Sequence, residues 1–185
     1  SIWANIAKHL HKNTFRAYPN CTGGIFMARK RSHFWLLLFC LFLPLAVGLL
    51  AGSLTRQQVA SYATMPKPSF APPGIVFPIV WNILYLLMGY SSYLVARSAS
   101  IKKHAALSVY SLQLLCNFFW PLIFFNLQAY LAAFLWLVTL FLLVVYMAIL
   151  FFDISRPTAY LQIPYLLWLL FAGVLNFCIW LGSRV

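Results

Sequence analysis

Long stretches without charge are the feature that most limits what this chain can fold into. Between Arg31 and Arg56 lie 24 residues that include no Lys, Arg, Asp or Glu. Three more such stretches, of 29, 49 and 27 residues, end at Arg97, Asp153 and Arg184. A membrane-spanning helix needs about 20 apolar residues, so the four stretches indicate one, one, two and one helices. The sequence therefore predicts an all-α integral membrane bundle of five transmembrane helices.

Composition supports this class and excludes others. Hydrophobic residues make up 64% of the chain and charged residues 8%, against about 45–50% and about 25% in soluble domains. Asp153 is the single acidic residue, beside 13 Lys and Arg. Catalysis by a pair of carboxylates is therefore excluded, and most routes to a Mg²⁺ or Ca²⁺ site are removed because these ions need several oxygen ligands. The continuously apolar stretches also argue against a barrel, whose strands alternate.

The boundaries of the helices follow from the charges and the polar breaks. The 49-residue stretch must contain a hairpin, and its polar break is Asn126-Leu127-Gln128. The helices are expected at residues 34–54, 74–96, 105–125, 129–151 and 157–182. We therefore expect a five-helix domain over 34–185 with a lid loop at 55–73. The basic segment 1–33 is expected to be a disordered tail or to lie on the membrane surface as an amphipathic helix.

Lys and Arg in the loops predict the orientation. With a cytoplasmic N-terminus, ten of these residues fall on the inner side, and the three on the outer side are Arg56, Lys67 and Arg184. Cytoplasmic loops carry the excess of Lys and Arg, so we predict a cytoplasmic N-terminus. The basic excess thus indicates topology and attraction to anionic lipid, and no nucleic-acid partner is expected.

Cysteine and histidine positions predict neither a metal site nor a bound cofactor. No two of the four cysteines are closely spaced, and three lie inside expected helices as small apolar residues. The four histidines lie outside the membrane interior or at its edge, so none is an obvious axial ligand for haem iron.

A proline-rich segment follows the first expected helix. Four prolines fall within residues 66–73. Proline fixes φ, removes a backbone donor and drives the preceding residue to an extended conformation, so the segment is expected to be stiff and non-helical. It is also longer than a connector needs. We interpret it as a lid over a cavity; the alternative is an inert belt in the membrane interface, anchored by Tyr62 and Phe70.

Five side chains fall from the midplane into the outer half of the expected helices, the half that this loop covers: Trp81, Asn82, Asn117, Trp120 and Trp168. At about 1.5 Å per residue, Trp81 lies about 10–12 Å below the outer start of the second helix. Trp120 in the third helix and Trp168 in the fifth lie between the midplane and the outer surface. Polar side chains in a bilayer usually face the bundle interior. The amides expected to point inward are Asn82, Gln113, Asn117, Gln162 and Asn176. Taken alone, each amide is also explained by an interhelical hydrogen bond, and each tryptophan by packing against lipid. The cavity is predicted because several of these side chains cluster at one depth.

Proline and glycine inside the helices give two further expectations. Pro78, Pro121 and Pro164 each free a carbonyl one turn earlier, so we expect kinks in three helices. Gly48 and Gly52 form a GxxxG pair, which favours close helix packing and suggests a homodimer.

Four motifs follow one another along the chain. They are KPSFAPP at 67–73, VWNILYLLMG at 80–89, LCNFFWPLIFF at 115–125, and PYLLWLLFA at 164–172 followed by Leu175-Asn176. Together with the five expected helices, these motifs resemble the translocator protein family, also called tryptophan-rich sensory proteins or peripheral-type benzodiazepine receptors. The resemblance extends over about residues 34–182.

The resemblance implies a five-helix bundle, usually dimeric, with a ligand pocket closed by the first loop. Family ligands include protoporphyrin IX, haem, cholesterol and isoquinoline or benzodiazepine drugs. The implied function is a membrane receptor or carrier in tetrapyrrole regulation or stress sensing. Expected partners are a porphyrin or haem, a sterol, the lipid bilayer and a second copy of the chain. The alternatives are a light-dependent porphyrin-degrading oxidase and a structural membrane protein.

The resemblance implies the candidate site by motif position, and depth supports the tryptophans and amides in it. The candidate ligand-binding residues are Tyr62, Pro72, Pro73, Trp81, Asn82, Asn117, Trp120, Phe124, Trp168 and Ala172. Some bacterial members of the family degrade protoporphyrin in light through two tryptophans, which correspond by motif to Trp81 and Trp168; these are catalytic candidates only if photo-oxidation occurs. Phe177 and Leu181 stand where the family's sterol motif has Tyr and Arg, which argues against specific cholesterol recognition.

Overall fold

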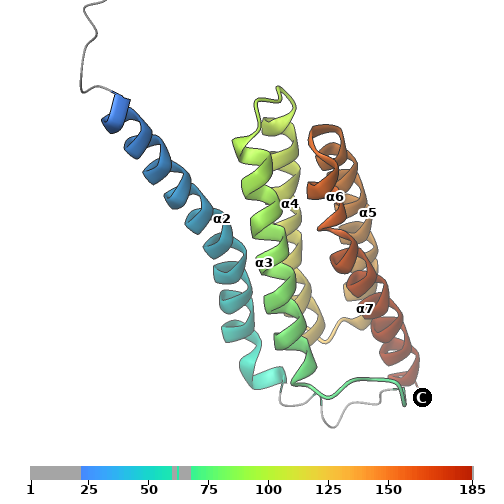
Figure 1. The fold of residues 1–185 in the computed structure, drawn as a ribbon. Helices are drawn as coiled ribbons and strands as arrows, with labels where there is room; N and C mark the ends of the chain where they lie inside the picture. The colour runs from blue at the N-terminus through green and yellow to red at the C-terminus, as the bar shows by residue number, and fades with distance from the viewer. Residues whose placement is uncertain (1–21, 60–61, 63–67, 185) are drawn as a thin grey trace, which may run out of the picture. The chain divides into compact units, whose positions relative to one another are not determined.

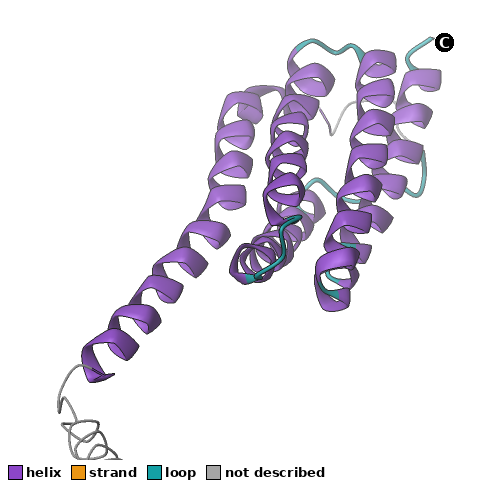
Figure 2. Ribbon diagram, turned by 90° about the horizontal axis from the view of Figure 1, so that it is seen from above, coloured by secondary structure: helices purple, strands orange, loops and turns teal. Residues whose placement is uncertain are grey.

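The computed structural model describes residues 22–59, 62 and 68–184, with side chains from residue 33 onward. This part of the chain consists of helices and loops (Figures 1 and 2). The helices are α2 (Thr22–Val59), α3 (Val76–Arg97), α4 (Lys103–Pro121), the π-helical turn η2 (Leu122–Asn126), α5 (Tyr130–Ile154), α6 (Arg156–Tyr160) and α7 (Ile163–Gly182).

Five segments of the described chain are long and apolar enough to cross a membrane. They are His33–Val59, Val76–Arg97, Lys103–Asn126, Tyr130–Ile154 and Arg156–Gly182. The predicted all-α class with five membrane spans is therefore confirmed. Most span limits lie within three residues of the predicted ones. The exception is the end of the first span, which continues to Val59 and so includes the start of the predicted lid loop.

The chain divides into two compact units, residues 1–36 and 37–185. The described part of the first unit is the start of α2, where the rings of Phe34 and Trp35 meet edge to face with centroids 5.9 Å apart. Because α2 begins at Thr22, the helix extends into the segment expected to be a basic tail. Residues 1–21 lie outside the described residues.

In the second unit, α3, α4, α5 and the α6–α7 pair form a ring of neighbouring helices (Figure 1). α4 packs between α3 and α5, α5 also contacts α6 and α7, and α6 closes the ring against α3. Large apolar side chains fill the centre, including Leu84, Met88, Leu137, Val144, Phe151 and Leu169. In a bilayer this packing of side chains, rather than exclusion of water, holds the helices together.

Residues 37–59 of α2 approach α3 at two glycines. A Cβ at Gly89 would lie 2.5 Å from the carbonyl oxygen of Cys40. Pro44 has no N–H, so this carbonyl lacks its usual helical donor, and the backbones of α2 and α3 come close together there. A Cβ at Gly48 would clash with the ring of Tyr85, whereas Gly52 has nothing within 4 Å. Gly48 of the GxxxG pair is therefore used inside the chain, and the homodimer stays a prediction.

The three prolines expected to kink helices lie at helix ends. Pro78 falls in the first turn of α3, where its missing N–H costs no helical bond, so it has no cause to bend the helix. Pro164 lies in the first turn of α7, directly after the break that separates α6 from α7. Pro121 ends α4, and the chain continues as the π-helical turn η2.

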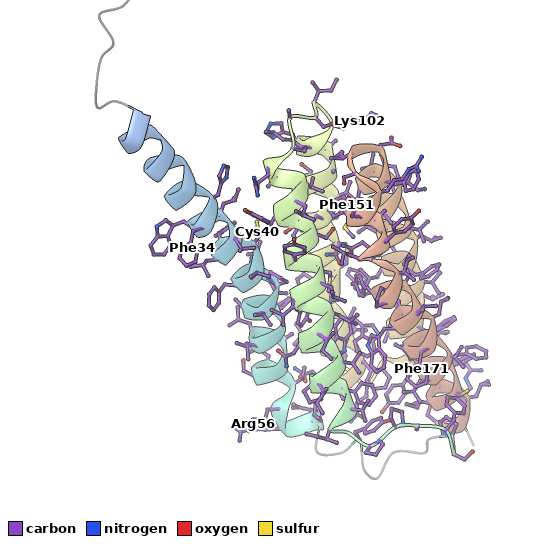
Figure 3. The ribbon with its side chains drawn as sticks, viewed as in Figure 1. Phe34, Cys40, Arg56, Lys102, Phe151 and Phe171 are labelled. Carbon is purple, nitrogen blue, oxygen red and sulfur yellow. The ribbon has the colours of Figure 1, made fainter. Side chains whose placement is uncertain are left out.

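The two ends of the second unit carry different charged residues. We call the end at which α2 and α7 finish and α3 and α5 begin the lid end; Arg56 lies there, and Lys102 lies at the opposite end (Figure 3). Asp153 also lies at the opposite end, where its carboxylate accepts a hydrogen bond from Lys102 Nζ at 2.7 Å. Which end faces the cytoplasm stays a prediction.

Candidate functional site

A small cavity lies at the lid end. Its volume is about 20 Å³. It is lined by Tyr62, Phe77, Trp120, Phe124, Phe125, Ala172, Leu175, Asn176 and Ile179. A space of this size holds about one water molecule. The cavity predicted under the loop thus corresponds in this structure to a small space lined mainly by aromatic and aliphatic side chains.

One face of α7 forms a wall of the cavity. Ala172, Leu175, Asn176 and Ile179 follow helical spacing, so their side chains lie on the same side of the helix, and all four are buried. The amide of Asn176 is placed 2.9 Å from the carbonyl oxygen of Tyr130 and 3.1 Å from the backbone nitrogen of Phe134. This amide therefore ties the wall to the first turns of α5.

The end of α4 supplies a stacked ring pair. Trp120 and Phe124 are both buried, with ring centroids 5.3 Å apart and planes at 26°. Pro121 lies between them and cannot donate a helical bond, and in η2 the backbone N–H of Leu127 donates to the carbonyl of Leu122 at 3.1 Å. Trp120 and Phe124 are four residues apart, a spacing that puts two side chains on the same side of a helix. No acceptor for the indole N–H of Trp120 is found among the described residues.

The loop after α2 covers this end of the bundle. Residues 68–75 are non-helical, as predicted, and run across the lid end from the side of α7 to α3 (Figure 1). The Tyr62 hydroxyl donates to the carbonyl of Pro72 at 3.4 Å, and its ring meets Phe77 edge to face at 5.3 Å. Burial raises the pKa of Tyr62, so its hydroxyl stays neutral. Phe70 is half exposed, and its ring meets that of Phe171 edge to face with centroids 6.4 Å apart. Partial exposure of an aromatic ring is typical of the membrane interface.

Trp168 stands beside the cavity rather than in its wall. Its ring centroid lies 5.8 Å from that of Phe77 and 5.3 Å from that of Phe171. The side chain is partly buried, and its indole N–H has no acceptor within the part of the chain that the structure describes. Phe77 therefore connects Trp168 to the cavity.

A hydrogen-bonded polar layer lies further into the bundle. We use this name for Tyr85, Gln113, Asn117 and Tyr165, which come from α3, α4 and α7. The Tyr85 hydroxyl donates to Asn117 Oδ1 at 3.1 Å, Asn117 Nδ2 donates to the Tyr165 hydroxyl at 2.8 Å, and that hydroxyl donates to Gln113 Oε1 at 3.0 Å. All four side chains are buried. The ring of Trp81 stacks on that of Tyr85 with centroids 5.4 Å apart, and it meets the ring of Tyr165 edge to face with centroids 6.1 Å apart.

The side chains at the lid end can stack on a flat apolar ring and donate hydrogen bonds through indoles and a phenol. Among the described residues no three His, Cys, Asp or Glu side chains come together as metal ligands do. A ligand at this site would therefore be held by aromatic faces and a few neutral donors.

Comparison with known proteins places the chain in a family. The sequence model described as the TspO/MBR family matches residues 40–181. The chain belongs to the TspO/MBR family. It is 38% identical over 147 residues to the tryptophan-rich protein TspO of Chlorobaculum tepidum, covering 77% of this chain and 92% of that protein. It is 34% identical over 147 residues to the translocator protein of Bos taurus, which covers 77% of this chain and 87% of that protein. It is 35% identical over 123 residues to protein CrtK of Rhodobacter capsulatus, which covers 65% of this chain and 77% of that protein.

Membership in the TspO/MBR family and the five spans identify a multi-pass integral membrane protein. The family relationship supports a membrane receptor or carrier.

Four of the five amides expected to point inward are buried in this family member, as predicted. They are Gln113, Asn117, Gln162 and Asn176. The fifth expectation is wrong, because Asn82 is exposed. Its Nδ2 donates to the carbonyl of Pro78 on the same helix at 2.8 Å. This local bond satisfies the amide without an interior partner, which removes the reason for it to face the bundle.

The structure brings together only part of the predicted site. The candidates that line the cavity are Tyr62, Trp120, Phe124 and Ala172. The candidates at the polar layer are Trp81 and Asn117. Pro72 is partly buried and accepts the hydrogen bond from Tyr62, whereas Pro73 is exposed.

Several lining residues were missed by the sequence analysis. They are Phe77, Phe125, Leu175 and Ile179, together with Tyr85 and Tyr165 of the polar layer. For α7 the spacing from Ala172 already held the information, since positions three, four and seven residues later share its face. The two tyrosines could have been found from their depth, because a hydroxyl near the membrane midplane needs a hydrogen-bond partner inside the bundle.

Proposed function

We propose that this protein is a membrane receptor or carrier for a flat tetrapyrrole such as protoporphyrin IX or haem, acting in tetrapyrrole regulation or stress sensing. The main support is the convergence of aromatic rings from the loop, α3 and the end of α4 on one cavity, faced by the small side chain of Ala172. The name of one relative, translocator protein, agrees with a carried ligand.

Binding requires the cavity to open. Its volume is about 20 Å³, whereas sites for ligands of this size measure about 300–1,000 Å³. The contacts that must separate are ring pairs, Tyr62 with Phe77 and Trp120 with Phe124. Each such pair contributes only about 0.5–1.5 kcal/mol beyond its buried area. The two faces of a tetrapyrrole would replace these contacts with stacking of the same kind.

The test fills the cavity. Ala172→Trp places an indole where the ligand would enter, and Ala132→Trp adds the same side chain at an exposed position of α5 outside the cavity. Protoporphyrin IX is titrated into protein in lipid nanodiscs and followed by its absorbance band. Ala172→Trp should weaken binding by about tenfold or more, which is about 1.4 kcal/mol, and Ala132→Trp should leave it unchanged.

A smaller change separates blocked binding from misfolding. Ala172→Leu should weaken binding while the variant still unfolds in one cooperative thermal transition. Its midpoint should lie below that of the parent, because a leucine overpacks a cavity of about 20 Å³. The proposal fails if wild-type protein shows no saturable binding, or if both Trp variants bind as well as the parent. Absence of any thermal stabilisation by protoporphyrin, haem or sterol would favour a purely structural protein.

A second candidate function is light-dependent oxidation of the bound porphyrin. The observation that favours it is the position of Trp81, whose indole contacts the rings of both Tyr85 and Tyr165. Dioxygen would be the oxidant, reduced to superoxide by one electron from the excited porphyrin, and the Trp81 indole with its two neighbouring phenols would be the relay for that electron. Illumination of the complex should then change the porphyrin spectrum more than in protein-free nanodiscs, and Trp81→Phe should reduce the change. An unchanged spectrum would exclude this function.

A further inference from the structure

A second hollow lies on the outside of the lid end. It is a groove of about 490 Å³ between the first turns of α5 and the last turn of α7. Tyr130, Leu131 and Leu135 line it from α5, and Trp180, Ser183 and Arg184 line it from the end of α7. Tyr130 separates the groove from the cavity, since its ring also meets Phe124 at 5.2 Å.

The polar part of the groove is cationic. The guanidinium of Arg184 lies 4.4 Å above the ring of Trp180, and the residue is exposed. Asp153, the single acidic side chain of the protein, lies at the opposite end of the bundle beside Lys102. The side-chain charge that lines the groove is therefore positive and suits an anionic group.

The rest of the groove is apolar and faces the lipid. Leu131 is 38% exposed and Leu135 is 58% exposed, one turn apart on the same face of α5. An Arg and a Trp at the end of a transmembrane helix lie at the level of the lipid headgroups, and the leucines further along α5 lie at the level of the acyl chains. The groove thus offers a charge for a headgroup above a surface for a hydrocarbon chain.

We propose that this groove binds one anionic phospholipid. Its phosphate accepts hydrogen bonds from the planar guanidinium of Arg184, a geometry that favours arginine over lysine. One acyl chain lies along Leu131 and Leu135. An anionic headgroup is preferred over a zwitterionic one because it brings no second positive charge next to Arg184. This site does not depend on the proposed tetrapyrrole function.

The experiment compares lipids that share their acyl chains. The protein is placed in nanodiscs with equal amounts of phosphatidylglycerol and phosphatidylcholine, and retained lipids are counted by native mass spectrometry. Wild-type protein should retain phosphatidylglycerol in excess. Arg184→Gln should reduce that excess by about fivefold, and Arg184→Lys should reduce it less.

Two further variants distinguish a site from general surface charge. Arg56→Gln removes an exposed arginine at the same end but outside the groove, so the excess should persist. Ala132→Trp fills the groove without changing charge and should reduce retention of both lipids. Equal effects of Arg184→Gln and Arg56→Gln, or unchanged retention in Ala132→Trp, would overturn the proposal. Loss of protoporphyrin binding in Ala132→Trp but not in Ala172→Trp would also overturn it, because the groove would then be the porphyrin site.

Discussion

The polar layer and the cavity at the lid end differ in how their polar groups are satisfied. In the polar layer, two phenols and two amides from three helices hydrogen-bond to one another at 2.8–3.1 Å. Around the cavity, the indole N–H groups of Trp120 and Trp168 have no acceptor in the described part of the chain. A buried polar group without a partner is costly, whereas a paired one is not. The comparison indicates that the polar layer holds helices together, and that two indole donors at the lid end are left for a ligand.

The largest effect is expected where α2 meets the polar layer. Gly48→Ala places a methyl group against the ring of Tyr85, which must move and pull its hydroxyl away from Asn117. Overpacking of this kind costs about 1–3 kcal/mol. The free energy of unfolding can be measured by SDS titration in mixed micelles.

Gly52→Ala is the matched control for this change. It lies one helical turn further along α2 and meets nothing within 4 Å. Replacing a helical glycine by alanine at an open position should stabilise the protein by about 0.5–1 kcal/mol. If both substitutions had the same effect, Gly48 would not be in contact with the polar layer.

The second prediction concerns Asn117, whose amide joins Tyr85 to Tyr165. Asn117→Leu removes both bonds and should cost about 1–2 kcal/mol, because interhelical hydrogen bonds in membranes average about 0.6 kcal/mol each. Asn126→Leu removes one bond, to the carbonyl of Leu54 at 3.2 Å, from an exposed position and should cost less. A loss of protoporphyrin binding in Asn117→Leu without loss of stability would mean that the polar layer also serves as a binding site.

The sequence was informative where a single physical rule decides the outcome. Charge spacing alone located the five spans, because a charged side chain is excluded from the bilayer core whatever it packs against. The α4–α5 hairpin was also predicted at its polar break, where Gln128 adopts a left-handed φ of 50°. The inward position of Gln113, Asn117 and Asn176 followed from the same cost of polar groups in lipid.

Sequence reasoning was less informative where two arrangements satisfy the same rule. Asn82 could bond inside the bundle or to its own helix, and its depth did not distinguish them. The π turn after Pro121 could not be predicted, because a missing N–H is compatible with a kink, a break or a wider turn. The volume of the cavity depends on how several rings pack together, which no single position determines.

The last and smallest prediction compares two indoles. The Trp136 N–H donates to the carbonyl of Cys116 at 2.8 Å, whereas the Trp120 N–H has no acceptor among the described residues. Trp136→Phe should therefore cost about 1 kcal/mol for the lost hydrogen bond beyond the smaller ring, and Trp120→Phe should lack that extra cost. SDS titration without ligand gives the two values. An equal loss in both variants would show that Trp120 is already paired and that the difference between the polar layer and the cavity is smaller than described. Repeating the titration with protoporphyrin IX sharpens the comparison, since a ligand that accepts from the Trp120 N–H should stabilise the parent more than Trp120→Phe.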